Sequence, residues 1–136
     1  MKTSFDISTS GLVAQRMRLN AISSNLANLS TTRNEDGELA AYQPRFVVFQ
    51  TDDAIATPAG GKGVKVSAVE SEDVEPLLKY QPNHPDANEQ GYVAYPNVDM
   101  TREFVDALEA TRAYEANIGA LEVAKDMSRQ TLRILG

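Results

Sequence analysis

All six prolines of this chain lie between residues 44 and 96, so a long proline-free stretch remains at each end. Proline breaks the interior of a helix, which leaves only the two ends free to form long helices. In both ends, apolar residues recur about every 3.5 residues, a spacing typical of helices that pair side by side. The sequence therefore predicts two terminal helices with a different kind of structure between them.

The N-terminal stretch follows this pattern from residue 5 to residue 29. The two heptad positions hold Phe5, Leu12, Leu19 and Leu26, and then Ser8, Gln15, Ile22 and Leu29. The prediction is a helix of about 22 residues, which is about 33 Å long.

The C-terminal stretch starts after Pro96, with Asp99 in the position of an N-cap. Glu103 lies near its start and Arg133 near its end, where each suits the helix dipole. The seam runs through Met100, Phe104, Ala107, Thr111, Tyr114, Ile118, Leu121, Lys125, Ser128, Leu132 and Leu135. The expected helix has about 36 residues and is about 54 Å long.

The middle of the chain is expected to be a small β-rich module. Residues 45–50 and 64–69 have the composition of strands, and a third strand is expected around residues 77–80. The acidic residues 51–54 and the glycine cluster at residues 60–63 are predicted to be mobile loops.

These elements predict the α+β class, with the terminal helices paired as an antiparallel coiled coil and the β module inserted between them. Residues 1–30 and 98–136 form the coiled-coil domain in this division, and residues 31–97 form the module. The C-terminal helix is expected to extend beyond its partner by about 20 Å.

Little in the chain favours catalysis. It has no cysteine and one histidine, His84, which lies in a predicted turn. Thiolate chemistry is excluded, and neither a zinc site nor a catalytic triad is expected. The sequence therefore predicts that the chain is not an enzyme and binds no metal or cofactor.

The charge and hydropathy pattern excludes further classes. The net charge of −6, without a basic stripe, argues against binding to nucleic acid. No apolar run reaches the roughly 18 residues of a membrane-spanning helix, so direct membrane insertion is not expected. The first ten residues lack the apolar core of a signal peptide, which predicts that any export occurs without a cleaved signal.

The apolar seams fit two interpretations: the core of an ordinary monomeric bundle, or an assembly seam that other subunits cover. Periodicity alone does not choose between them. The candidate seam residues are Leu12, Leu19, Ile22, Leu26, Leu29, Phe104, Leu108, Tyr114, Ile118, Leu121, Leu132 and Leu135. If they form an assembly seam, both ends should be disordered in the free chain and ordered on assembly.

Several motifs resemble the bacterial flagellar rod and hook axial proteins. The first helix carries ISTSGL at residues 7–12 and SSNLANLST at residues 23–31. The segments NHPDAN at 83–88, GYVAYPNVD at 91–99 and ATRAYEAN at 110–117 are similar to a short, proximal-rod member of this family. The motif residues of interest are Asn25, Ala27, Asn28, Gly91, Tyr92, Tyr95, Pro96 and Asn97.

The resemblance implies a structural subunit that polymerises into the helical tube of the rod, transmits torque and encloses an export channel. It implies a location in the periplasmic rod of the basal body and export through the flagellar type III apparatus. The implied partners are copies of the chain, other proximal- and distal-rod subunits, and the adaptor between the rod and the MS ring. The alternative is a soluble helical adaptor or export chaperone.

Overall fold

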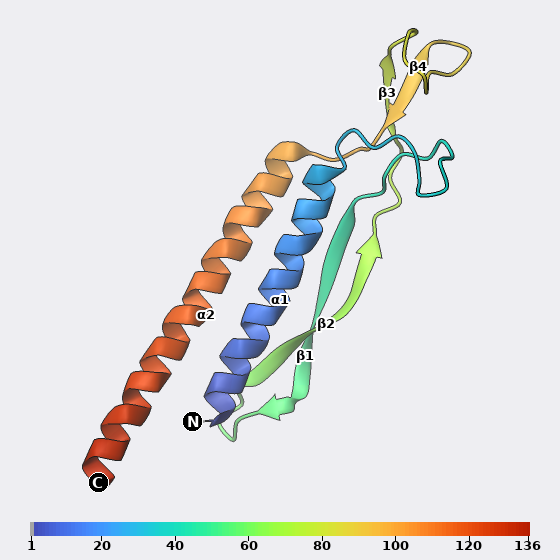
Figure 1. The fold of residues 1–136 in the computed structure, drawn as a ribbon. Helices are drawn as coiled ribbons and strands as arrows, with labels where there is room; N and C mark the ends of the chain where they lie inside the picture. Colours follow the sequence, from blue (N-terminus) through green and yellow to red (C-terminus); the bar gives the residue numbers. More distant parts are fainter. Residues whose placement is uncertain (1) are drawn as a thin grey trace.

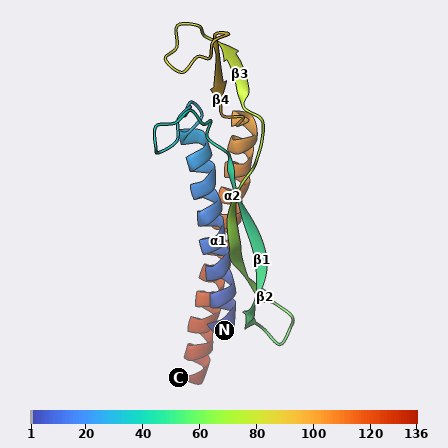
Figure 2. The same cartoon turned by 90° about the vertical axis from the view of Figure 1, so that its right-hand side faces the viewer.

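The computed structural model describes residues 2–136 (Figure 1). The elements are α1 (Lys2–Ala27), β1 (Arg45–Ala56), β2 (Lys62–Ser71), β3 (Leu77–Tyr80), β4 (Tyr92–Tyr95) and α2 (Met100–Leu135). The two helices run antiparallel, and the ribbon of β1 and β2 lies along α1 (Figures 1 and 2). The predicted α+β class, with paired terminal helices and a β module between them, is confirmed.

Helix α1 is the centre of the molecule because it packs against α2 and against both strands of the long ribbon. The ribbon attaches where the Ser10 hydroxyl accepts a hydrogen bond from the Val64 backbone N–H at 3.0 Å. The few apolar side chains that are fully buried are small or medium in size: Ala14, Ala21, Ile22, Val93 and Ala110. A core this small leaves most large apolar residues near the surface.

The C-terminal helix begins where the sequence predicts. The Asp99 carboxylate accepts hydrogen bonds from the N–H groups of Thr101 and Arg102, at 3.0 and 3.3 Å, so it is the N-cap. Helix α2 has 36 residues and α1 has 26, so the difference in length corresponds to about 15 Å. This is less than the predicted 20 Å because α1 is longer than expected. Figure 1 shows the end of α2 extending past the start of α1.

The long ribbon corrects the prediction of a mobile acidic loop. Residues 51–56 belong to β1, where Thr51 pairs with Val64 and Ala56 with Lys62. Two register shifts along the ladder interrupt the alternation of apolar and polar residues, so the sequence pattern ends before the strand does. The glycine cluster does form the turn, with Gly60 at a φ of 89°.

A second, short hairpin stands beyond the upper end of the helices, joined by antiparallel pairing of β3 with β4 (Figure 1). The third predicted strand, β3, is confirmed, whereas β4 was not predicted. Within residues 2–136, no helix packs against this hairpin and neither strand of the long ribbon does. We call residues 77–95 the outer hairpin.

The face of α2 that pairs with α1 differs from the predicted seam. Its buried and half-buried residues include the heptad series Glu103, Ala107, Ala110, Tyr114, Asn117, Leu121, Ala124 and Ser128. Phe104 and Leu132 belong to the predicted seam but are 57% and 68% exposed. On this face, the small residues Ala107, Ala110 and Ala124 accompany larger ones such as Tyr114 and Leu121, and the helices approach closely at Gly11. Ala107, Tyr114, Leu121 and Ser128 belong both to the predicted seam and to the observed pairing face, whereas Phe104 and Ile118 are exposed beside that face. The predicted pairing face of α2 is therefore right for one of its two heptad positions and wrong for the other.

Gly11 shows how close this approach is. A Cβ atom at this position would lie 2.8 Å from the side-chain nitrogen of Asn117 on α2, whereas nothing lies within 4 Å of a Cβ at Gly119. We expect Gly11→Leu to lower the free energy of unfolding by about 1–3 kcal/mol through overpacking. The matched change Gly119→Leu should raise it by about 0.5–1 kcal/mol, because glycine is a poor helix former. Urea denaturation of both variants measures the difference, and equal effects would contradict the close packing at Gly11.

No helix within residues 2–136 combines the length and the apolar character that crossing a membrane requires.

Candidate assembly surface

The upper half of α1 is fixed to the start of β1 by one buried amide. Asn25 is only 2% exposed. Its side-chain N–H donates to the Arg45 carbonyl at 2.8 Å, and its side-chain oxygen accepts from the Arg45 N–H at 2.8 Å and from the Tyr42 hydroxyl at 3.0 Å. These bonds satisfy both backbone polar groups of Arg45 where the chain returns from the loop after α1. Asn25 therefore sets the position of the long ribbon on the helix.

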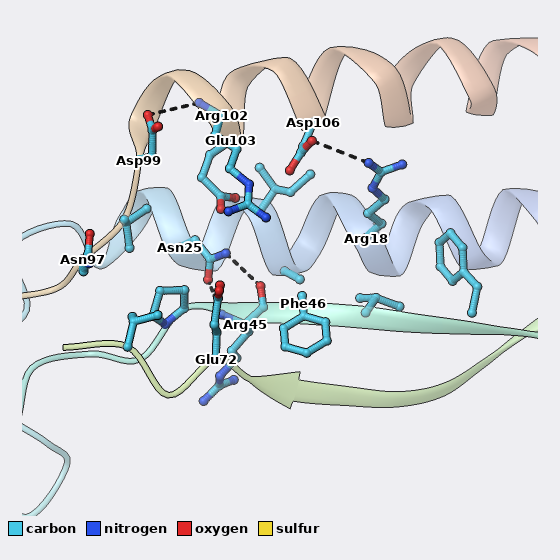
Figure 3. Close-up of a pocket in the computed structure, with 17 residues that line it drawn as sticks. Arg18, Asn25, Arg45, Phe46, Glu72, Asn97, Asp99, Arg102, Glu103 and Asp106 are labelled. Atoms are coloured by element: carbon cyan, nitrogen blue, oxygen red, sulfur yellow. Dashed lines mark hydrogen bonds and ion pairs between the residues drawn. The ribbon is translucent and has the colours of Figure 1, made fainter. Parts of the chain in front are cut away.

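A pocket of about 440 Å³ opens between the first turns of α2, the upper half of α1 and the start of β1 (Figure 3). Its apolar wall includes Ile22, Phe46 and Phe49. Its charged lining consists of Arg18, Arg45, Glu72, Asp99, Arg102, Glu103 and Asp106. A pocket with aromatic side chains and charges of both signs suits a protein segment better than a small apolar ligand. We call it the upper pocket.

Two of the four acidic side chains of the upper pocket are already engaged, Asp99 as the N-cap of α2 and Asp106 in an ion pair. Arg18 on α1 lies 3.8 Å from Asp106 and 3.3 Å from Glu109, and it ties the two helices together (Figure 3 shows the first of these pairs). Burial raises the pKa of Glu103, and the nearby Asp106 carboxylate acts in the same direction. Within the part of the chain that the structure describes, neither Glu103 nor Glu72 forms an ion pair with a basic side chain.

The outer hairpin is held to the body by Asp86. This carboxylate accepts hydrogen bonds from the Thr32 hydroxyl at 2.6 Å and from the Arg33 Nε at 2.7 Å, and it forms an ion pair with the Arg33 guanidinium. The hydrogen bond from Thr32, followed by that from Arg33, holds the pKa of Asp86 below its ordinary value. We call these three residues the Asp86 clamp.

The Asp86 clamp predicts how the outer hairpin responds to pH. Folding lowers the pKa of Asp86, so the ionised carboxylate stabilises the folded state fully at pH values above its ordinary pKa of about 3.9. This stabilisation is lost as the pH falls through the lowered pKa of the folded state. At neutral pH, we expect Asp86→Asn to speed amide exchange in residues 77–95 and to leave β1 and β2 unchanged. Glu89→Gln, an exposed carboxylate in the same loop, is the matched control. Equal exchange in both variants would show that the clamp does not hold the hairpin.

The motif that ends the middle segment shapes the outer hairpin. Gly91 has a φ of 84°, and a Cβ there would lie 2.9 Å from the Tyr80 ring, so only glycine fits. The Tyr92 ring packs edge-on against Tyr80, and the Tyr95 hydroxyl donates to the Gln81 side chain at 2.6 Å. His84 lies in a turn, as predicted, with its ring beside Tyr95.

The remaining motif residues lie at the ends of the helices. Ala27 is the last residue of α1 and is exposed, and the Asn28 side chain donates to the Ser24 carbonyl at 2.7 Å. Pro96 is buried, and Asn97 lines the upper pocket. Ala27 and Asn28 thus lie at the C-terminal end of α1, and Pro96 and Asn97 lie just before the N-terminus of α2.

The candidate seam residues divide between the interior and the surface. Ile22 is buried, and the half-buried members are Leu12, Leu19, Leu26, Leu29, Tyr114 and Leu121. The exposed members, all on α2, are Phe104, Leu108, Ile118, Leu132 and Leu135. Sequence reasoning missed four further exposed apolar residues on the same helix: Val105, Val123, Met127 and Ile134. We call the exposed apolar residues of α2 the outer face.

The paired helices, the small core and the many large apolar residues left exposed on α2 are typical of a subunit that buries surface against other chains. Family models for flagellar rod proteins match two parts of the chain: "Flagella basal body rod protein" at residues 5–33 and "Flagellar basal body rod FlgEFG protein C-terminal" at residues 89–134.

Curated relatives match nearly the whole chain. The flagellar basal-body rod protein FlgC of Bacillus subtilis is 40% identical over 96% of this chain and 95% of its own length. FlgC of Salmonella typhimurium is 42% identical over 96% and 94%, and FlgC of Borreliella burgdorferi is 37% identical over 98% and 96%. The chain therefore belongs to the FlgC family of flagellar basal-body rod proteins and is a structural subunit of that rod.

The comparisons confirm the predicted family and the predicted location in the basal-body rod, and they do not favour the alternative of a soluble adaptor or chaperone. Membership also implies assembly with other rod subunits. Within residues 2–136, no group of three or more histidine, cysteine, aspartate or glutamate side chains is arranged to hold a metal ion.

Proposed function

We propose that the chain polymerises in the proximal part of the rod as a helical tube that transmits torque and encloses an export channel. The observation that carries this proposal is the outer face of α2, which no other part of the described chain covers. Burying it against neighbouring subunits would remove a large apolar surface from water. In this proposal the helices of residues 1–30 and 98–136 form the inner layer of the tube, and residues 31–97 lie outside it.

The contacts between subunits are heterologous in this proposal, because a head-to-tail interface that does not close extends into a helical polymer. The exposed seam residues Phe104, Leu108, Ile118, Leu132 and Leu135 form part of these contacts. The partners are further copies of the chain, other proximal- and distal-rod subunits and the adaptor to the MS ring, with delivery by the flagellar type III apparatus. The role is mechanical, with no catalytic step.

Complementation tests the proposal. The chain is expressed in a motile bacterium whose own FlgC gene is deleted, and basal bodies are purified and imaged by electron microscopy. We expect rods of normal length that contain the chain close to the MS ring. Rods that form without the chain, or that contain it only at the distal end, would contradict the proposal.

A further inference from the structure

The upper pocket holds two carboxylates that lack a cation. Glu103 and Glu72 form no ion pair within residues 2–136, although Arg18, Arg45 and Arg102 also line the pocket. Arg18 is engaged by Asp106 and Glu109. Glu103 is half-buried, and burial raises its pKa against the opposing effects of the Asn25 side-chain hydrogen bond and the Arg102 charge, whereas Glu72 is exposed. An incoming guanidinium would relieve the cost of burying the Glu103 carboxylate. The pocket also exposes the aromatic rings of Phe46 and Phe49.

The complementary chemistry lies at the other end of the molecule. Residues 127–135 of α2 carry Arg129 and Arg133 and no acidic residue. The two arginines are four residues apart and therefore lie on one side of the helix. Leu132, between them in sequence, and Ile134 are 68% and 85% exposed. Arg129 already lies 3.8 Å from Asp126, whereas Arg133 forms no ion pair within residues 2–136. This end of α2, which we call the basic tip, thus offers one engaged and one free cation together with apolar side chains.

The basic tip cannot reach the upper pocket of its own chain. Glu103 and Arg129 belong to the same straight helix, where 26 residues of separation correspond to about 39 Å. Only another molecule can bring the two together. Because the pocket lies near one end of the helical pair and the tip at the other, copies in the same orientation would contact head to tail along the molecular axis (Figure 1).

We infer that the basic tip of one copy docks in the upper pocket of the next, with Arg129 and Arg133 against Glu103 and Glu72 and with Leu132 against Phe46. This inference rests on the proposed function, to which it adds a specific contact between copies. Complementary charge fixes the orientation and register of such a contact, and the aromatic wall supplies apolar burial. A contact of this kind repeats without closing, as growth of a tube requires.

The test uses a fluorescent peptide of residues 117–136 and the full-length chain, with binding measured by fluorescence anisotropy. Saturable binding is expected, and it should weaken at high salt. Glu72→Lys with Glu103→Lys in the chain should weaken it at least about tenfold, as should Arg129→Glu with Arg133→Glu in the peptide. Combining the charge-reversed chain, which carries both lysines, with the charge-reversed peptide, which carries both glutamates, should bring the affinity back to within about threefold of that of the wild-type pair. Glu75→Lys, outside the pocket, is the matched control and should change little.

Failure of the contact can be told apart from failure of the proposed function. If the reversed chain binds the original peptide as well as the wild type does, or if the wild-type chain does not bind the peptide, the docking site is wrong. The proposed function still stands in that case, provided that the chain restores rods in the complementation experiment. If the wild-type chain does not restore rods, the proposed function itself fails.

The absence of native cysteines allows a second measurement on assembled rods. A double variant with Val98→Cys, beside the pocket, and Leu132→Cys, in the tip, should give disulfide-linked multimers on mild oxidation. About 50 Å of helix separates the two positions, too far for a disulfide within one chain. Each single variant is a control and should remain monomeric. Double-variant rods that stay monomeric on oxidation would overturn the inference.

Discussion

Asn25→Leu is expected to lower the free energy of unfolding by about 2–5 kcal/mol. The change removes three hydrogen bonds and leaves the N–H and C=O groups of Arg45 without their side-chain partner. Each unsatisfied buried polar group costs about 1–3 kcal/mol. Urea denaturation followed by circular dichroism measures the loss, and amide exchange should show that residues near Arg45 open first.

Two further variants sharpen this prediction. Asn25→Asp keeps the side-chain oxygen that accepts from Arg45 and Tyr42, but it places a second oxygen against the Arg45 carbonyl, so it should also destabilise the fold. Asn28→Ala should cost less than about 1 kcal/mol, because the Asn28 side chain forms its hydrogen bonds with near neighbours, the Ser24 carbonyl and the Thr31 hydroxyl. Equal losses at Asn25 and Asn28 would mean that the bonds to Arg45 do not fix the ribbon on α1.

Phe104→Ser combined with Leu108→Ser is expected to abolish rod assembly while leaving the fold intact. Both side chains are more than half exposed, so the free energy of unfolding should change by less than about 0.5 kcal/mol for each substitution. On assembly, the same side chains are expected to be buried, where each contributes about 1.5–3 kcal/mol. Swimming in soft agar and the yield of basal bodies from the complemented strain measure the effect.

The matched control is Glu115→Ala combined with Glu122→Ala, which changes two exposed polar positions on the same helix. This variant should support normal swimming. If the serine variant also swims normally, the outer face near Phe104 is not a contact in the rod. If it is instead poorly folded when free, its failure to swim carries no information about contacts, and Leu108→Gln alone, with a longer polar side chain, provides the decisive comparison.

The elements of the fold were predictable where local signals are strong. The absence of proline in both ends, the cap at Asp99 and the alternation around Val64 and Val66 each depend on neighbouring residues only. The second half of β1 was missed because its ladder contains register shifts, and β4 because four residues are too few to show a pattern. These failures arise where pairing with a distant strand determines the structure.

The surface of α2 was harder to predict. Counting apolar residues at heptad positions favours the largest side chains, such as Phe104 and Ile118, whereas the contact with α1 uses Ala110 and Asn117 opposite Gly11. Small residues alone would not have identified the pairing face either, because Ala116 and Ala120 are exposed on the same helix. The partners of Asn25 and Asp86 lie 17–20 and 53–54 residues away in the sequence, so only the folded chain shows them.

Hydrogen exchange on the free chain and on purified basal bodies tests the central claim most directly. The account predicts fast amide exchange in residues 129–135 of the free chain, which are all exposed, and strong protection of the same residues in the assembled rod. Residues 18–25, held between α2 and the ribbon, serve as an internal reference that is protected in both. Equal exchange of residues 129–135 in the free and the assembled chain would contradict the claim that rod assembly covers α2.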